Sequence, residues 1–238
     1  MNTENLLYLK DAYLREIETE VKSVYGKYVV LENTIFYATG GGQPCDTGKI
    51  VRLKDNKEFN VVFVGVFNNE VSHEVDLEGL QKEDKVKCFL NWERRYTFMK
   101  YHTAMHLLVS IINKHSGALI TGNQIGDDKS RLDLNLENFS KEDFIKWIDE
   151  VNELIKKDAM VKNYFISKED AMKNPSLFKL KDKLSKDLDE YRITDVEGID
   201  IQADGGTHVN SLKEIGKLEF LKAENKGKDN RRVYFRVV

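Results

Sequence analysis

Two short segments, about a hundred residues apart, constrain how this chain can fold. His102 and His106 are separated by Thr-Ala-Met, and Asp204 and His208 are separated by Gly-Gly-Thr. Residues four positions apart share one face of a helix, so a helix through the first segment would direct both imidazole rings to one point. The pair Gly205-Gly206 permits a tight turn that would let Asp204 and His208 converge. A metal site built from these residues requires a fold that brings the two segments together.

These side chains form a donor set with a clear metal preference. Three imidazoles and one carboxylate suit a borderline divalent cation, zinc first, so we expect one Zn²⁺ per chain. A lone pair of histidines at this spacing on an apolar helix is more often core packing than a metal site. Three of the five histidines fall in the two segments, however, which favours the metal site. We interpret the other two, His73 and His115, as ordinary polar or core residues.

The composition excludes several classes of protein without naming a partner. With 238 residues, 41% of them hydrophobic, the chain can form one large domain or two small ones. The formal net charge of -3 indicates no particular ligand. No apolar run reaches membrane-spanning length, and the N-terminus lacks the pattern of a signal peptide. Because Cys45 and Cys88 are the only cysteines, there is no disulfide framework. We expect a cytoplasmic protein with no membrane partner, as a monomer or a weak dimer.

Charge is uneven along the chain. Between Lys213 and Arg236 there are eight basic and four acidic residues, a local excess of +4. The centre of this segment is a basic turn that contains Lys226, Lys228, Arg231 and Arg232. A phosphate backbone would be attracted to such a turn. The alternative is a solvated hairpin without a nucleic-acid partner.

Residues 1–92 have the pattern of short strands. Runs of β-branched and aromatic residues, bounded by turn residues, occur at 28–31, 61–64 and 86–90. Many short strands without long helices predict a small N-terminal β-barrel. The loop Gly40-Gly41-Gly42 within it must turn sharply or approach something closely. It matches neither a dinucleotide-binding fingerprint nor a phosphate-binding P-loop.

Residues 93–238 begin with strong helical periodicity. A helix of about two dozen residues starts near Glu93, carries His102 and His106, and ends near Gly117. Its histidine pair would lie among apolar residues on neighbouring stripes of the same helix.

Further helices and strands follow in the second half. Ser140 is a predicted N-cap with Asp143 three residues later, and Ser167 is expected to cap a third helix that ends before Pro175. Strands return from Ile199 onward. The expected fold class is α+β: an N-terminal small β-barrel (1–92) followed by an α+β core (93–238) with a long metal-bearing helix and an antiparallel sheet.

Several motifs together resemble those of a known family. His-Thr-Ala-x-His-Leu-Leu from His102, followed by Gly-Gly-Thr-His-Val from Gly205, is similar to the alanyl-tRNA editing family. That family comprises the free-standing AlaX proteins and the editing domain of alanyl-tRNA synthetase. The further matching motifs are Thr34–Tyr37, Gly40–Pro44, Asp46–Gly48, Trp92–Arg95 and Gly122–Asp133. The resemblance covers nearly the whole chain and is to the medium-length type of AlaX.

One position departs from the family pattern. The family usually has Cys-Gly-Gly-Thr-His, whereas Asp204 occupies the cysteine position here. A carboxylate oxygen binds zinc at about 2.0–2.2 Å and a thiolate at about 2.3 Å, and both carry one negative charge. We interpret Asp204 as a retained ligand with weakened selectivity for soft metals. The alternative is a site that has lost its metal.

Four protein ligands would also close a tetrahedral site, so either one of the four is not a ligand or the coordination expands when substrate binds.

The resemblance implies a trans-editing aminoacyl-tRNA deacylase. Its expected reaction is zinc-dependent hydrolysis of the ester in mischarged Ser-tRNA(Ala), with Gly-tRNA(Ala) as a second candidate substrate. A pocket for alanine cannot firmly exclude glycine by size or serine by one added hydroxyl, so a second site must discriminate. The alternative is a catalytically impaired module with a degraded metal site that still binds tRNA or a synthetase.

The resemblance also implies roles for residues outside the metal site. Gln43 in the glycine-rich loop is the expected nonmetal residue at the reacting group, and Thr39 is the expected hydroxyl that recognises serine. Arg94, Arg95 and Arg131, with the basic turn, are expected to contact the acceptor end of tRNA(Ala). Each of these basic residues could equally be structural.

Overall fold

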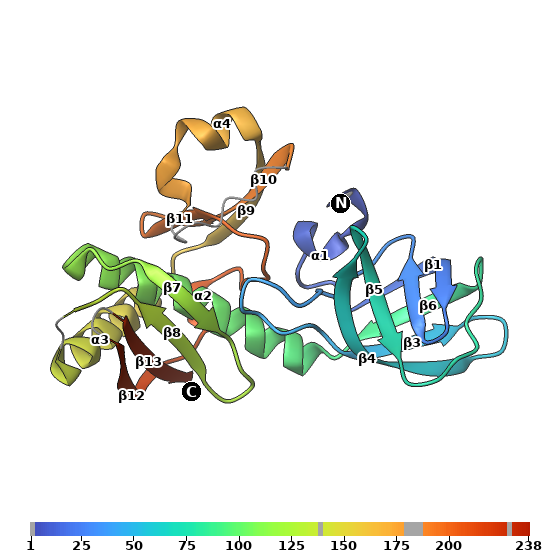
Figure 1. Cartoon of the computed structure of the whole chain (residues 1–238), viewed down its shortest axis with the longest axis horizontal. Helices are drawn as coiled ribbons and strands as arrows, with labels where there is room; N and C mark the ends of the chain where they lie inside the picture. The colour runs from blue at the N-terminus through green and yellow to red at the C-terminus, as the bar shows by residue number, and fades with distance from the viewer. Residues whose placement is uncertain (1–2, 138–139, 179–187, 228–229) are drawn as a thin grey trace. The chain divides into compact units, whose positions relative to one another are not determined.

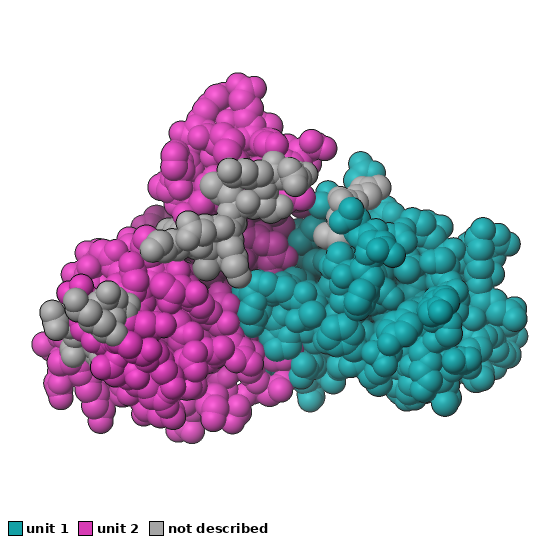
Figure 2. Space-filling view, viewed as in Figure 1, with its two compact units in different colours: residues 1–97 teal, residues 98–238 magenta. Residues whose placement is uncertain are grey.

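The computed structural model describes residues 3–137, 140–178, 188–227 and 230–238. The chain divides into two compact units, residues 1–97 and residues 98–238 (Figure 2). Figure 1 labels the helices and strands along the chain. In the described part of the chain, no helix combines the length and apolar character needed to cross a membrane.

Unit 1 contains a closed antiparallel barrel, which confirms the predicted N-terminal barrel. Its strand order is β1-β2-β5-β4-β3-β6. A short N-terminal segment precedes the barrel, with η1 (Thr3–Asn5) and α1 (Leu7–Lys10). The barrel strands are β1 (Glu16–Tyr25), β2 (Tyr28–Leu31), β3 (Gly48–Arg52), β4 (Lys57–Phe67), β5 (Glu70–Val75) and β6 (Lys85–Leu90). The three runs predicted as strands lie within β2, β4 and β6.

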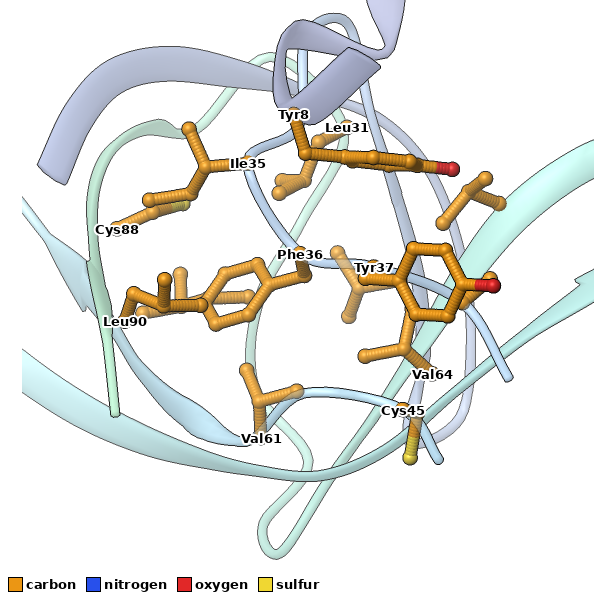
Figure 3. Packing of buried hydrophobic residues seen from close by; sticks show 14 of the residues in the cluster. Tyr8, Leu31, Ile35, Phe36, Tyr37, Cys45, Val61, Val64, Cys88 and Leu90 are labelled. Carbon is orange, nitrogen blue, oxygen red and sulfur yellow. The ribbon is translucent and has the colours of Figure 1, made fainter. Parts of the chain in front are cut away.

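The interior of the barrel is filled by side chains, as expected for a barrel of this size. Successive side chains of a strand point to opposite faces, and in β4 Phe59, Val61 and Val64 are directed into the core. Phe36 and Ile35, from the segment between β2 and β3, pack among them (Figure 3). Cys45 and Cys88 are free, in agreement with the absence of a disulfide framework, and both are buried in this cluster. Burial raises the pKa of the Cys88 thiol to about 12.

The glycine run forms a tight turn within unit 1. Gly41 and Gly42 have φ values of +59° and +90°, a region that side chains disfavour and that a turn with two left-handed central residues requires. The backbones of Gly40 and Gln43 hydrogen-bond to each other in both directions, at 2.9 and 3.1 Å. The turn is therefore closed on itself, and the sharp bend expected from the three glycines is present.

His73 is buried in the wall of the barrel. Its Nδ1–H donates to the carbonyl oxygen of Val29 (2.9 Å), and its Nε2 accepts from the hydroxyl of Thr34 (2.8 Å). Burial lowers the pKa of His73 to about 4. His73 is thus a neutral core residue, as the sequence predicted.

The pH dependence of stability should report this histidine. An unfolded histidine has a pKa near 6.5, so the stability that neutral His73 provides is complete above that pH and is lost as the pH falls toward 4. We expect the free energy of unfolding to fall by about 3 kcal/mol over this window. Denaturant titrations at a series of pH values should show a smaller fall for His73→Gln. Equal pH dependence of the parental protein and the variant would contradict the prediction.

Unit 2 is built on α2 (Trp92–Ser116), which begins in unit 1, and on two antiparallel sheets. The strand orders are β11-β10-β9 and β12-β13-β8-β7. The strands are β7 (Ile120–Gln124), β8 (Ser130–Leu134), β9 (Val161–Ser167), β10 (Glu190–Val196), β11 (Asp200–Ala203), β12 (Leu218–Gly227) and β13 (Asn230–Val237). The remaining helices are α3 (Lys141–Lys157), α4 (Lys168–Lys173), η2 (Pro175–Leu177) and η3 (Leu212–Glu214). The α+β class and the long helix are confirmed.

The predicted helix caps are present. Ser140 and Asp143 form a reciprocal capping box at the start of α3, and the side chain of Ser167 accepts from the backbone of Asp170 at the start of α4. The prediction that strands return only from Ile199 was wrong, because β7, β8, β9 and β10 precede it. β7, for example, has the sequence ITGNQ, which lacks a strand-like apolar alternation and is held by its pairing with β8.

Candidate metal centre

The long helix α2 supplies the first two members of the predicted donor set. His102 and His106 lie one above the other on the same face, and the centroids of their rings are 5.1 Å apart. Both are almost fully buried, with 4% and 5% of their surface exposed. The helical spacing therefore produces the convergence expected from the sequence.

The loop after β11 supplies the other two. The backbone N–H of Gly206 donates to Oδ2 of Asp204 at 2.6 Å, and Asp204 N donates to the carbonyl oxygen of Arg192 at 3.0 Å. Neither Gly205 nor Gly206 has a positive φ. The turn that we expected from glycine flexibility is instead fixed by the carboxylate of Asp204, which hydrogen-bonds the backbone two residues later.

The structure brings all four predicted donors together. One ligand atom from each of His102, His106, Asp204 and His208 lies within 4.8 Å of the others. His102 Nε2 is 3.6 Å from Asp204 Oδ1, and His208 Nε2 is 2.9 Å from Asp204 Oδ2. Ligand atoms around a tetrahedral zinc with bonds near 2.05 Å are about 3.3 Å apart. The donor chemistry suits a zinc-sized divalent ion, and the two distances from Asp204 to the histidines, 2.9 and 3.6 Å, lie on either side of this spacing.

Hydrogen bonds orient His208 toward the cluster. Its Nδ1 lies 3.1 Å from Thr103 Oγ1, which donates its proton to the carbonyl oxygen of Met99 (3.0 Å) and accepts the N–H of Val209 (3.2 Å). The hydroxyl proton is already used, so Nδ1 of His208 carries the proton and donates to Thr103. Nε2 of His208 faces Asp204 Oδ2 at 2.9 Å, so a bound metal would take the place of the proton in that hydrogen bond.

Burial favours the neutral, metal-binding form of two of the imidazoles, His102 and His208. Burial lowers the pKa of His102 to about 4 and lowers the pKa of His208 well below its usual value. Burial would raise the pKa of Asp204, but the neighbouring His102 and His208 more than offset it and hold that pKa well below its usual value. Neutral imidazoles and an ionised carboxylate are the forms that bind metals.

Arg192, on β10, holds the loop that carries Asp204. Its guanidinium donates to the carbonyl oxygens of Gly206 (2.9 Å) and Asp204 (3.2 Å). Sequence reasoning missed this residue, as it missed Asp200 and Gln202 on β11. No local pattern marks them, because their contacts depend on how β10 and β11 pair.

The two arginines at the start of α2 differ in their surroundings. Arg95 is fully buried, and its guanidinium donates to the carbonyl oxygens of Ala12 (2.9 Å) and Ile35 (2.7 Å) and to the carboxylate of Asp46. These partners all lie in unit 1, and they support the structural role that the sequence left open beside a tRNA contact. Arg94 is partly exposed, and its Nε donates to the carbonyl oxygen of Cys45 (3.3 Å).

The remaining basic residues surround the β8–β13 pair. Arg131 and Arg232 both bind the carboxylate of Asp133, with the closest contacts at 2.9 and 2.7 Å. Arg231 is largely buried and donates to Gly227 O at 2.6 Å. Lys226 is paired with Glu224 but remains half-exposed. Lys228 lies outside the described residues.

Gln43 and Thr39 lie in the glycine-rich loop of unit 1. Gln43 is buried, with 1% of its surface exposed, and Thr39 is exposed. The hydroxyl of Thr39 donates to the carbonyl oxygen of Gln43 at 3.4 Å, and its N–H donates to Val64 O at 3.0 Å. The loop thus holds both residues in a defined backbone conformation.

Comparison with known families agrees with this architecture. Residues 5–94 match the family model described as tRNA synthetases class II (A). Residues 191–234 match the model described as threonyl and alanyl tRNA synthetase second additional domain. Both models describe parts of aminoacyl-tRNA synthetases, and the second includes Asp204 and His208.

Individual relatives are similar over nearly the whole chain. The alanyl-tRNA editing protein AlaX-M of Methanosarcina barkeri is 45% identical, over 98% of this chain and 98% of its own length. AlaX-M of Saccharolobus solfataricus is 42% identical, over 97% and 98%. The alanine–tRNA ligase of Methanococcus aeolicus is 34% identical over 92% of this chain, which corresponds to 24% of the ligase. The chain belongs to the AlaX family of alanyl-tRNA editing proteins and is of the medium-length type.

Proposed function

We propose that this protein is a trans-editing deacylase that hydrolyses the ester of mischarged Ser-tRNA(Ala), and of Gly-tRNA(Ala) as a second substrate, with one Zn²⁺ per chain. The observation that carries the proposal is the buried cluster His102, His106, Asp204 and His208. It occurs in a chain that is 45% identical, from end to end, to a protein named for alanyl-tRNA editing.

The residues of the cluster have distinct tasks in this proposal. A bound zinc ion would polarise the ester carbonyl or lower the pKa of a water molecule. The three histidines hold the ion in a site from which water is largely excluded. Asp204 supplies the one negative charge, and its side chain is 20% exposed, against 5% or less for His102 and His208. Substrate would therefore reach the cluster on the Asp204 side.

The partner in this proposal is aminoacylated tRNA(Ala). Half-exposed basic groups on the second sheet, Lys226 above all, would contact phosphates of the acceptor end. Arg131 and Arg232 share one carboxylate, Asp133, so together they carry a net positive charge. Two free cysteines suit the reducing cytoplasm, where we place this activity.

The test is a deacylation time course on protein whose metal has been quantified. Ser-tRNA(Ala), Gly-tRNA(Ala) and Ala-tRNA(Ala) are incubated with the protein, and loss of the ester is followed. We expect rapid loss of the serine ester, sparing of the alanine ester, and near one zinc per chain. No turnover by folded protein, even after zinc is added back, would support a tRNA- or synthetase-binding module instead.

Gln43 should affect the reaction and not the affinity for tRNA. Its backbone closes the glycine turn and is kept in Gln43→Ala, whereas its amide is lost. Loss of one donor at a reacting carbonyl typically lowers kcat by about 10²- to 10³-fold, so we expect that fall in single-turnover hydrolysis of Ser-tRNA(Ala). The Kd for tRNA should stay within about twofold of the parental value. Gln81→Ala, an exposed glutamine in the same unit, is the matched control. A parental rate of hydrolysis by Gln43→Ala would show that Gln43 does not act at the reacting group.

A further inference from the structure

Two side chains of β11 converge on one nitrogen of His106. Oδ2 of Asp200 lies 3.4 Å from Nδ1 of His106, and Nε2 of Gln202 lies within hydrogen-bond distance of the same atom. Asp200 and Gln202 are two positions apart on a strand and so share one face, while Ile201 between them is directed away and is 38% exposed. Asp200 and Gln202 are both buried.

Asp200 and Gln202 favour different tautomers of the His106 imidazole. An ionised carboxylate only accepts, so Asp200 favours a proton on Nδ1 of His106. An amide NH₂ only donates, so Gln202 in this orientation favours a bare Nδ1 and a proton on Nε2. Only the first tautomer leaves Nε2 free to bind a metal. If the Gln202 amide turns over, its oxygen becomes an acceptor for the same Nδ1–H, whereas Asp200 in its ionised form can only accept.

We propose that Asp200 is a positioning residue that holds His106 as the Nδ1–H tautomer and thereby presents Nε2 to the metal. This inference rests on the metal dependence in the proposed function. A carboxylate behind a metal-binding histidine fixes the orientation of the ring and raises the basicity of the ligand nitrogen. Gln202 is the adaptable partner, because its amide can present either its NH₂ group or its oxygen to Nδ1 of His106.

Asp200→Asn is the variant that isolates this role. It keeps the size and the strand backbone, but the new amide can donate to Nδ1 and favour the wrong tautomer. The same exchange behind the histidine of a catalytic triad leaves the geometry intact and disables the imidazole in this way. We expect zinc affinity, measured by competition with a chromophoric chelator, to fall by about 10- to 100-fold.

A second change should reverse the loss. Gln202→Glu restores a carboxylate beside the same Nδ1, so the double variant Asp200→Asn/Gln202→Glu should recover most of the parental zinc affinity. Asp195→Asn is the matched control, because Asp195 is a carboxylate on the adjacent strand β10 that has no described contact with the cluster. Its zinc affinity should equal the parental value. A purely structural role for Asp200 would not be rescued by a charge on residue 202.

Two spectroscopic readouts do not depend on activity, and the first needs no variant. In ¹⁵N-correlated NMR spectra of the zinc-loaded parental protein, we expect His106 to carry its proton on Nδ1. Cobalt substituted for zinc should give a visible absorption spectrum that changes in Asp200→Asn and returns toward the parental spectrum in the double variant. Circular dichroism checks that each variant is folded.

The outcomes separate this inference from the proposed function. If the parental protein binds no zinc, the proposed metal-dependent function fails. If it binds zinc with Nδ1 of His106 as the ligand, or if folded Asp200→Asn has parental affinity and an unchanged cobalt spectrum, the role of Asp200 fails while the proposed function stands.

Discussion

Asp204→Asn will lower the zinc affinity of this protein by more than about 100-fold while leaving the fold intact. The asparagine side-chain oxygen can still accept the N–H of Gly206, which the carboxylate accepts at 2.6 Å, so the turn survives. The negative charge that faces His102 and His208 is lost, however. Residues that only support a ligand typically contribute about 10- to 100-fold to metal affinity, and a charged ligand should contribute more. Chelator competition measures the affinity, and deacylation of Ser-tRNA(Ala) should fall with it.

Two further substitutions at position 204 separate the role of this residue in the turn from its role as a metal ligand. Asp204→Ala removes both the ligand and the acceptor for Gly206, so it should lose zinc and also lower the melting temperature. Asp204→Cys supplies a thiolate of the same charge, so it should bind zinc at least as tightly as the parental protein. Its preference for cadmium over zinc should rise, because a soft ligand has replaced a hard one.

The ranking of the three variants decides what Asp204 does. Parental zinc affinity in folded Asp204→Asn would mean that the three histidines alone hold the ion. If the parental protein binds no zinc but Asp204→Cys does, the aspartate at this position does not support metal binding. That is the alternative left open from the sequence.

The sequence predicted the parts of the fold that depend on local chemistry. The convergence of the histidine pair on α2 was predicted because residues four positions apart share one face of a helix. The capping box at Ser140 was predicted because its two partners are three residues apart. The N-terminal barrel was predicted from short runs of β-branched and aromatic residues bounded by turn residues, and the structure confirms it. Each of these features is decided within a window of a few residues.

The parts that were missed depend on contacts between distant segments. Arg192 holds the Asp204 loop only because β10 pairs with β11, and Asp200 reaches His106 only because β11 lies along α2. The sequence left open whether Arg95 is structural or contacts tRNA, because no local pattern signals the burial of a basic residue. Its partners Ala12, Ile35 and Asp46 come from separate parts of the barrel unit.

Disruption of the buried pair of Arg95 and Asp46 is expected to have a second large effect, on the stability of unit 1. The side chains of Arg95 and Asp46 are fully buried, and the carboxylate accepts from Nε of Arg95 at 3.0 and 3.1 Å and from the backbone N–H of Tyr37 at 2.6 Å. Removal of one partner of such a pair leaves a charge in a medium that cannot solvate it. We expect Asp46→Ala to destabilise unit 1 by about 3–5 kcal/mol, measured by denaturant unfolding.

Further variants separate the effect of the buried ion pair from other effects of removing the carboxylate of Asp46. Asp76→Asn, a carboxylate that accepts two hydrogen bonds from Asn60 at the surface of the same unit, is the matched control and should change stability little. Arg95→Met combined with Asp46→Ala removes both charges, so part of the lost stability should return, because no unpaired guanidinium remains. The return will be incomplete, since Tyr37 N–H still lacks its acceptor and the carbonyl oxygens of Ala12 and Ile35 lose their donor. A double variant no more stable than Asp46→Ala would contradict the expectation that the unpaired guanidinium is the main cause of the loss.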